Sequence, residues 1–209
     1  MAAKDRSTAT RDAIVEAAIE EFIERGFAGV RMEHVAKRAG YNKALVYRWF
    51  KDRETLFREA LKRRFSQRAG LLDKLPETLP EILRWWSQQT AADPNFMRMI
   101  LREALEARDK EPAHAEFRRD YYRRQIELLK SFQVNGRISP EFDLEMLFIA
   151  LLSVVTMTSA LPQIVQLATG LRPGDKKFRK RWAAFLEMLA AHLSGATRSA
   201  DCAATKRTT

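Results

Sequence analysis

The spacing of apolar residues constrains this chain more than any other feature. Apolar side chains recur three and four positions apart, for example at Ile14, Ala18 and Phe22, and again over Phe178, Trp182, Phe185 and Leu189. Alternating apolar and polar runs, which predict strands, and two-residue hairpin turns do not occur. The sequence therefore predicts an all-α protein.

Proline and glycine divide the chain into helices, because proline is tolerated in the first turn of a helix and glycine just past its end. Pro94, Pro112 and Pro140 mark starts, and Gly26 and Gly136 mark stops. The predicted helices, about nine in number, cover residues 8–25, 32–39, 43–50, 53–74, 79–92, 94–108, 112–134, 140–169 (bent at Pro162) and 175–194.

The lengths of these helices indicate two domains. Three short helices come first and long ones follow. We expect a small N-terminal domain over residues 1–55 and a larger helical domain over residues 56–195, with the fourth helix as the connector between them. Residues 1–7 and the polar tail, residues 196–209, are expected to be disordered.

Charge and cysteine content narrow the classes of partner and site. The formal charge of +10 and the isoelectric point near 10.0 favour polyanions such as nucleic acid or an acidic membrane surface. The only cysteine, Cys202, lies in the tail, which excludes an intramolecular disulfide or a Cys-based zinc site and fits a reducing cytoplasm. The N-terminal sequence has no apolar stretch after its charges and does not predict a secretory signal.

One uncharged stretch, residues 146–171, is long enough to span a bilayer. Polar residues such as Ser153, Thr156 and Gln163 interrupt it, and each would need a hydrogen-bond partner in lipid. We therefore expect a helix that is buried on all sides, and no membrane partner.

A short turn joins the predicted helices 32–39 and 43–50. It consists of Gly40, Tyr41 and Asn42. Glycine suits the left-handed backbone that ends a helix, and the Asn42 side chain can cap the next one. Two short helices joined in this way are typical of a helix-turn-helix.

The second helix of this motif has two different faces. At 100° per residue, Val46, Trp49 and Phe50 share one side, which leaves Ala44 and Arg48 opposite. The segment 31–53 also contains seven Lys or Arg residues and only two acidic ones. We expect attraction to phosphate to be concentrated here.

The motif is part of a longer pattern. From residue 13 the sequence reads AIVEAAIEEFIERGFAGVRMEHVAKRAGYNKALVYRWFKDRETL. Over about residues 10–57 it resembles the TetR family of transcriptional regulators, with that family's long first helix, Gly-aromatic turn, Val/Ile-Ala-x-x-Ala-Gly second helix and Leu-Tyr-x-x-Phe-Lys third helix. Leu45 stands where the family often has Thr, Ala44 where Gly is frequent, and Val30-Arg31 where a Thr pair is common, so the operator sequence is not implied.

The resemblance implies a repressor, less often an activator, whose N-terminal module binds DNA and whose C-terminal helical domain dimerises and usually holds a small molecule. The implied DNA-binding residues are Arg31, Asn42, Lys43, Ala44, Leu45, Tyr47, Arg48, Trp49 and Lys51. Among them Lys43, Ala44, Leu45 and Arg48 would face the major groove. Tyr47 and Lys51 would contact phosphates, and Trp49 would either pack or donate to a phosphate.

The C-terminal domain offers a candidate apolar pocket. Its predicted lining is Trp85, Trp86, Phe96, Met99, Arg102, Phe117, Tyr121 and Gln125. Aromatic and methionine side chains suit an adaptable pocket for a small effector, although ordinary core packing explains each of them equally well. No cofactor is predicted.

Long apolar stripes on helices 140–169 and 175–194, with Leu147, Leu151 and Phe185 among their members, predict a homodimer. A two-fold dimer matches a palindromic operator on double-stranded DNA. The basic cluster from Arg172 to Arg181 is interpreted as a solvated face, and a contact with an anionic lipid, ligand or nucleic acid stays open.

Two other classes of function are alternatives to a regulator. An enzyme is not predicted, because Glu111 and His114 form only one copy of the Glu-x-x-His spacing of di-iron bundles and no nucleophile motif or phosphate-binding glycine loop occurs. An architectural or ligand-independent DNA-binding protein is the alternative to a regulator that senses a small molecule. It would discriminate weakly between sequences.

Overall fold

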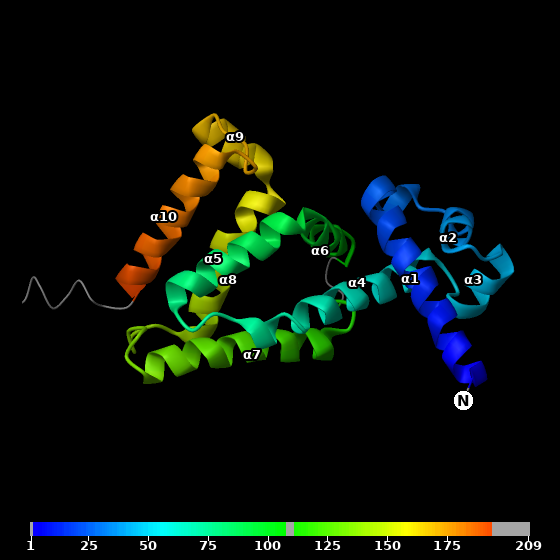
Figure 1. Ribbon diagram of the computed structural model, residues 1–209, viewed down its shortest axis with the longest axis horizontal. Coiled ribbons are helices and arrows are strands. Elements are labelled where there is room, and N and C mark those ends of the chain that lie inside the picture. The colour runs from blue at the N-terminus through cyan, green and yellow to red at the C-terminus, as the bar shows by residue number, and fades with distance from the viewer. Residues whose placement is uncertain (1, 108–110, 194–209) are drawn as a thin grey trace, which may run out of the picture. The chain divides into compact units, whose positions relative to one another are not determined.

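The computed structural model describes residues 2–107 and 111–193, which form ten α-helices and one short 3-10 helix without any strand (Figure 1). This confirms the all-α class. The helices are α1 (Ala2–Gly29), α2 (Met32–Ala39), α3 (Lys43–Trp49), α4 (Arg53–Ala69), η1 (Leu72–Lys74), α5 (Leu79–Ala92), α6 (Pro94–Ala107), α7 (Ala115–Val134), α8 (Leu144–Ala160), α9 (Pro162–Thr169) and α10 (Lys176–Leu193).

Some helix ends differ from those predicted. Helix α1 begins at Ala2 rather than at residue 8, so the expectation of disorder over the first residues is wrong for residues 2–7. The stop predicted at Gly26 is confirmed, because its φ of +66° interrupts the helix there. The predicted tail, residues 196–209, lies outside the described residues.

The helix predicted over residues 140–169 is two helices. It starts at Leu144 instead of Pro140, because the Asp143 carboxylate accepts the backbone N–H groups of Glu145 and Met146 and so caps α8. Pro162 opens the separate helix α9, at 83° to α8. The bend predicted at this proline is therefore a complete break.

The chain forms two compact units. Unit 1 runs through Leu72 and includes residues 98–118, and unit 2 comprises residues 73–97 and those from Arg119 onward. The boundary predicted near residue 55 falls inside unit 1, because α4 packs along α1.

In unit 1, α1 packs against both α2 and α4, and α2 packs against α3. The side chains at the predicted three- and four-residue spacing, Ile14, Ala18 and Phe22, are all buried. Phe57 meets Phe22 edge to face, with ring centroids 5.0 Å apart. Val46 is also fully buried, so α3 is attached to this core by one side.

In unit 2, α5 packs against α8 and α10 around a core that includes Trp86, Phe148 and Leu186. No single helix in the described ranges is long and apolar enough to cross a membrane, and only the bent pair α8 and α9 meets that test of length and composition together. The expectation that this stretch is buried on all sides is wrong, since Met146 and Ile149 are more than half exposed.

Candidate nucleic-acid interface

The turn between α2 and α3 has the geometry that its residues predict. Gly40 adopts a left-handed conformation with φ +76°, and its N–H donates to carbonyl oxygens of α2. The N–H of Tyr41 also donates to the Ala36 carbonyl oxygen, at 2.9 Å, which closes the end of α2. Asn42 Oδ1 then accepts the Leu45 N–H at 2.8 Å and caps α3. Local hydrogen bonds thus fix where α3 begins and how it leaves the turn.

Helix α3 has one buried side and one exposed side. Val46 and the following Phe50 are buried, at 0% and 1% exposure, as the sequence predicts. Ala44 and Arg48 on the opposite side and Lys43 and Tyr47 on the flank are all exposed, while Leu45 is half-buried. The side chains predicted to meet a DNA groove therefore lie together on one accessible face.

Trp49 is half-buried at the end of this helix. Its indole Nε1 is buried and has no acceptor among the described residues. Of the two roles considered for Trp49, this orientation corresponds to packing. A hydrogen bond to a phosphate would require the ring to turn.

Beside α3 the surface forms a hollow. Its lining consists of Val30, Arg31, Met32, Glu33, Tyr47, Lys51, Asp52 and Arg53. Tyr47 and Lys51, which are predicted to contact phosphates, meet here with Arg31, which is predicted to bind DNA, and the three come from three segments. The Asp52 carboxylate accepts the Thr55 N–H at 2.7 Å, and this hydrogen bond lowers the pKa of Asp52 and caps α4. The hollow therefore combines a phenol with three cations and two carboxylates beside α3.

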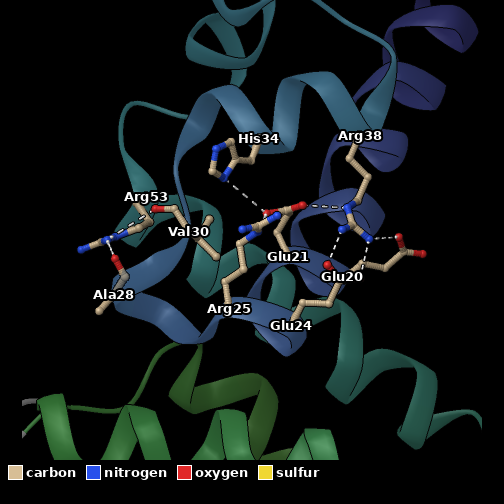
Figure 2. Close-up of polar contacts among 9 residues, drawn as sticks. All are labelled: Glu20, Glu21, Glu24, Arg25, Ala28, Val30, His34, Arg38 and Arg53. Carbon is tan, nitrogen blue, oxygen red and sulfur yellow. Dashed lines mark hydrogen bonds and ion pairs between the residues drawn. The ribbon is translucent and has the colours of Figure 1, made fainter.

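Arg38 does not belong to the cationic face that the sequence predicts. Figure 2 shows its guanidinium held by three glutamates of α1. Arg38 Nε donates to Glu21 at 2.8 Å, and Nη1 donates to Glu20 at 3.0 Å and to Glu24 at 2.9 Å. The hydrogen bond to Glu24 is the main cause that raises the pKa of Arg38. Arg38 therefore attaches α2 to α1 instead of attracting phosphate.

Arg53 is a second cation with a partner inside the module. Its Nη1 donates to the Ala28 carbonyl oxygen at 3.0 Å (Figure 2). Its guanidinium lies 4.4 Å from the centroid of the Phe27 ring. Nη1 also donates to the Val30 carbonyl oxygen at 3.5 Å, so Arg53 binds both the end of α1 and the loop that follows it. Of the seven basic residues counted over segment 31–53, Arg38 and Arg53 thus have structural roles.

Sequence reasoning missed one pair on the exposed face. Glu33, in the first turn of α2, is ion-paired with Lys43, the first residue of α3. The pair lowers the pKa of Glu33 and raises that of Lys43. No periodic spacing signals such a contact, because the two residues lie on different helices on either side of the turn.

Two family models match the chain. Residues 14–60 match the model of bacterial regulatory proteins of the tetR family, and residues 79–188 match a tetracyclin repressor-like C-terminal domain. The protein belongs to the TetR family. It is a TetR-family transcriptional regulator, and the family consists of DNA-binding regulators rather than enzymes.

Individual relatives agree with this assignment. The HTH-type transcriptional repressor SCO4008 of Streptomyces coelicolor is 27% identical over 189 residues, which cover 87% of this chain and 98% of the relative. The crystal structure of SCO4942 from Streptomyces coelicolor has a TM-score of 0.69 at 24% identity, covering 86% of this chain and 97% of that one. FadR from Bacillus subtilis, solved in complex with stearoyl-CoA, has a TM-score of 0.63 at 19% identity, with 83% and 96% covered.

The pocket residues predicted for this TetR-family chain fall in both units. Trp85, Trp86, Phe96, Tyr121 and Gln125 belong to unit 2, and Met99, Arg102 and Phe117 belong to unit 1. Arg102 lies 5.5 Å from the centroid of the Phe27 ring. The Gln125 side chain is buried and donates to the Tyr121 carbonyl oxygen at 3.2 Å. In unit 2 the buried indole Nε1 of Trp86 has no acceptor among the described residues.

The apolar stripe predicted for the dimer has the wrong register on α8. Leu147 and Leu151 are buried in the core of unit 2. The exposed apolar side chains of α8 are Met146, Ile149 and Met157, and those of α10 are Phe185 and Met188. Both predicted helices therefore have an accessible apolar face, formed on α8 by different residues.

The basic cluster before and within the first turns of α10 is exposed. Its cations are Arg172, Lys176, Lys177, Arg179, Lys180 and Arg181. Only Phe178 from this segment points into the core, where its ring stacks on that of Trp182 with centroids 6.0 Å apart. This arrangement agrees with a solvated face.

Proposed function

We propose that this protein is a repressor that binds a specific double-stranded DNA operator as a homodimer and leaves it when a small, apolar ligand binds the C-terminal domain. The observation that carries the proposal is the exposed face of α3, where Lys43, Ala44 and Arg48 are presented together by a capped helix. We assign DNA binding to residues 1–55, and ligand binding and dimerisation to residues 56–195. Such a regulator would act in the cytoplasm, where operator DNA lies.

The residues of this face divide into two proposed roles. Arg48 and Lys43 carry donors that pair with acceptors on guanine in the major groove, and Ala44 and Leu45 can contact a thymine methyl group. Arg31, Tyr47 and Lys51 line the hollow beside α3 and would hold phosphates on either side of the groove. The cap formed by Asn42 would fix the angle at which α3 enters the groove.

Dimerisation through α8 and α10 is supported by their exposed apolar side chains. Met146 and Ile149 on α8 and Met188 on α10 are each more than half exposed, and exposed large apolar side chains of this kind are typical of interaction surfaces. A two-fold dimer would place two copies of α3 on half-sites about one helical turn apart, or a small multiple of that distance. The operator would then be palindromic.

A ligand is supported by the aromatic content of unit 2 and by one unsatisfied donor. Buried polar groups are nearly always hydrogen-bonded, and the Trp86 indole N–H has no acceptor within residues 2–107 and 111–193, so an acceptor on a bound molecule would satisfy it. FadR, a structural relative, holds stearoyl-CoA. Acyl-CoA thioesters of different chain lengths are therefore suitable first probes in a thermal-shift screen of apolar compounds.

Competition for a labelled duplex tests the proposal. The label is placed on DNA from upstream of the protein's own gene, and unlabelled copies of that DNA compete with an unrelated duplex of equal length. A specific regulator should prefer its own site by roughly 10³–10⁷-fold. Equal competition by both duplexes would favour the alternative, an architectural DNA-binding protein.

A further inference from the structure

Lys43 is an exposed residue at the start of α3, the helix to which we assign DNA binding. Its Nζ is 2.5 Å from Glu33 Oε1 and 5.7 Å from the centroid of the Tyr47 ring. The Lys43 and Glu33 side chains are 52% and 55% exposed, so solvent and DNA can reach both. The ion pair bridges the two helices of the motif at the surface and not in its core.

Glu33 is one of two exposed acidic residues that line the hollow. The other acid there, Asp52, has its carboxylate bound to the Thr55 N–H. Arg31 and Lys51, which line the same hollow, attract phosphate, whereas a carboxylate repels it. The negative charge of Glu33 therefore opposes the attraction of Arg31 and Lys51 for phosphate, and its position requires an explanation other than tight binding.

The pair is not needed to hold α2 against α3. The turn at Gly40, the cap at Asn42 and the buried side chains of Val35 and Val46 already fix that geometry. An exposed ion pair adds little stability and exchanges readily with other partners. Lys43 can therefore leave Glu33 and bind another partner.

We propose that Glu33 sets sequence discrimination by competing with DNA for Lys43, an inference that rests on the proposed function. On an unrelated duplex Lys43 stays with Glu33, and one phosphate fewer is neutralised. On the operator a guanine presents N7 and O6 in line with the start of α3, and Lys43 exchanges its partner. Glu33 is in this sense a positioning residue that acts through Lys43.

The experiment uses a duplex enriched from a random pool by the full-length wild-type chain, and a shuffled duplex of the same composition. For Glu33→Gln we expect affinity for the shuffled duplex to rise roughly threefold to tenfold and its salt dependence to steepen by about one phosphate contact. Affinity for the enriched duplex should rise more, because only there does the wild-type chain have to break the ion pair between Glu33 and Lys43, so the ratio of the two affinities rises. Glu33→Asp keeps the charge and should retain the wild-type ratio.

Two controls separate this role from a general effect of charge. Glu20→Gln removes the same charge from an exposed partner of Arg38 on α1 and should leave the ratio unchanged. In a Lys43→Gln background, Glu33→Gln should not change the ratio further. The inference would be overturned if Glu33→Gln and Glu20→Gln changed the ratio of affinities equally. It would also be overturned if Glu33→Gln changed the ratio as much in the Lys43→Gln background as in the wild type. If the wild-type chain enriches no duplex at all, the proposed function itself fails.

Discussion

The Nε atom of Arg38 on α2 lies 2.8 Å from Oε1 of Glu21 on α1, and the Glu21 side chain is only 3% exposed. Glu21 also accepts a hydrogen bond from Arg25 Nε at 2.8 Å, and His34 Nδ1 lies 3.8 Å from it. A buried carboxylate is tolerated here because two guanidinium groups bind it. This contact sets the position of α2, and through α2 the position of α3.

Glu21→Gln should therefore destabilise the N-terminal module. The amide keeps the shape of the side chain but removes the charge that pairs with Arg38 and Arg25, and we expect a loss of about 1–3 kcal/mol in the free energy of unfolding. Urea denaturation measures it. Glu20→Gln, which changes an exposed partner of the same arginine, should stay within about 0.5 kcal/mol of the wild type. Equal effects would show that the burial of Glu21 is unimportant.

Arg48→Ala and Lys51→Ala should weaken DNA binding in different ways. Arg48 lies on the exposed face of α3, so its loss should cost about 1–3 kcal/mol on the operator and relax the preference at one base position. Lys51 lines the hollow, so its loss should weaken all duplexes alike and make the salt dependence shallower. Binding titrations over a range of salt concentrations distinguish them. A uniform loss for Arg48→Ala would assign Arg48 to a phosphate.

His114 should make the stability of unit 1 depend on pH. Burial lowers its pKa against the opposing effect of Glu59, whose Oε1 lies 3.6 Å from His114 Nε2. The unfolded chain then takes up the proton first as pH falls below the ordinary histidine value of about 6.5, so stability is lost on acidification. His114→Asn tolerates the local φ of +54° and should reduce this loss. The thermal midpoint of unfolding is measured between pH 7 and 5 for both proteins. Identical pH profiles for the wild type and for His114→Asn would contradict this role of His114.

Met188→Glu should separate the proposed dimer. Met188 is 53% exposed on α10, and a carboxylate placed there would be buried without a partner in a dimer interface. Light scattering after size-exclusion chromatography should show a dimer for the wild type and a monomer for the variant. Val134→Glu is the matched control, since Val134 is a 79% exposed apolar residue at the end of α7. A monomeric wild type would refute dimerisation.

Residues close together in the sequence predict the helix-turn-helix of α2 and α3 well. The turn at Gly40, the cap at Asn42 and the division of α3 into a buried and an exposed side depend on residues close in sequence, and all three agree with the structure. The start of α8 was missed because the Asp143 cap determines where the helix begins and Pro140 does not.

Long-range pairs could not be read from the sequence. Arg38 and Arg53 were counted as phosphate-attracting cations, but their partners lie on α1 and in the loop that follows it. The exposed face of α8 was likewise placed on Leu147 and Leu151, because a helix that is apolar all round gives no sign of which side meets the core. Contacts between helices that are distant in sequence determine both the partners of these arginines and the exposed side of α8.

The central claim is that two copies of α3, one from each subunit of a dimer, recognise DNA sequence through their exposed faces. Enrichment of a random duplex pool by the wild-type protein tests this claim most directly. The account predicts a motif with two-fold symmetry, whose half-sites are centred about 34–36 Å apart or a small multiple of this distance, and a loss of preference at one position per half-site with Arg48→Ala. Recovery of no motif, or of a single unsymmetrical site that Arg48→Ala leaves unchanged, would contradict it.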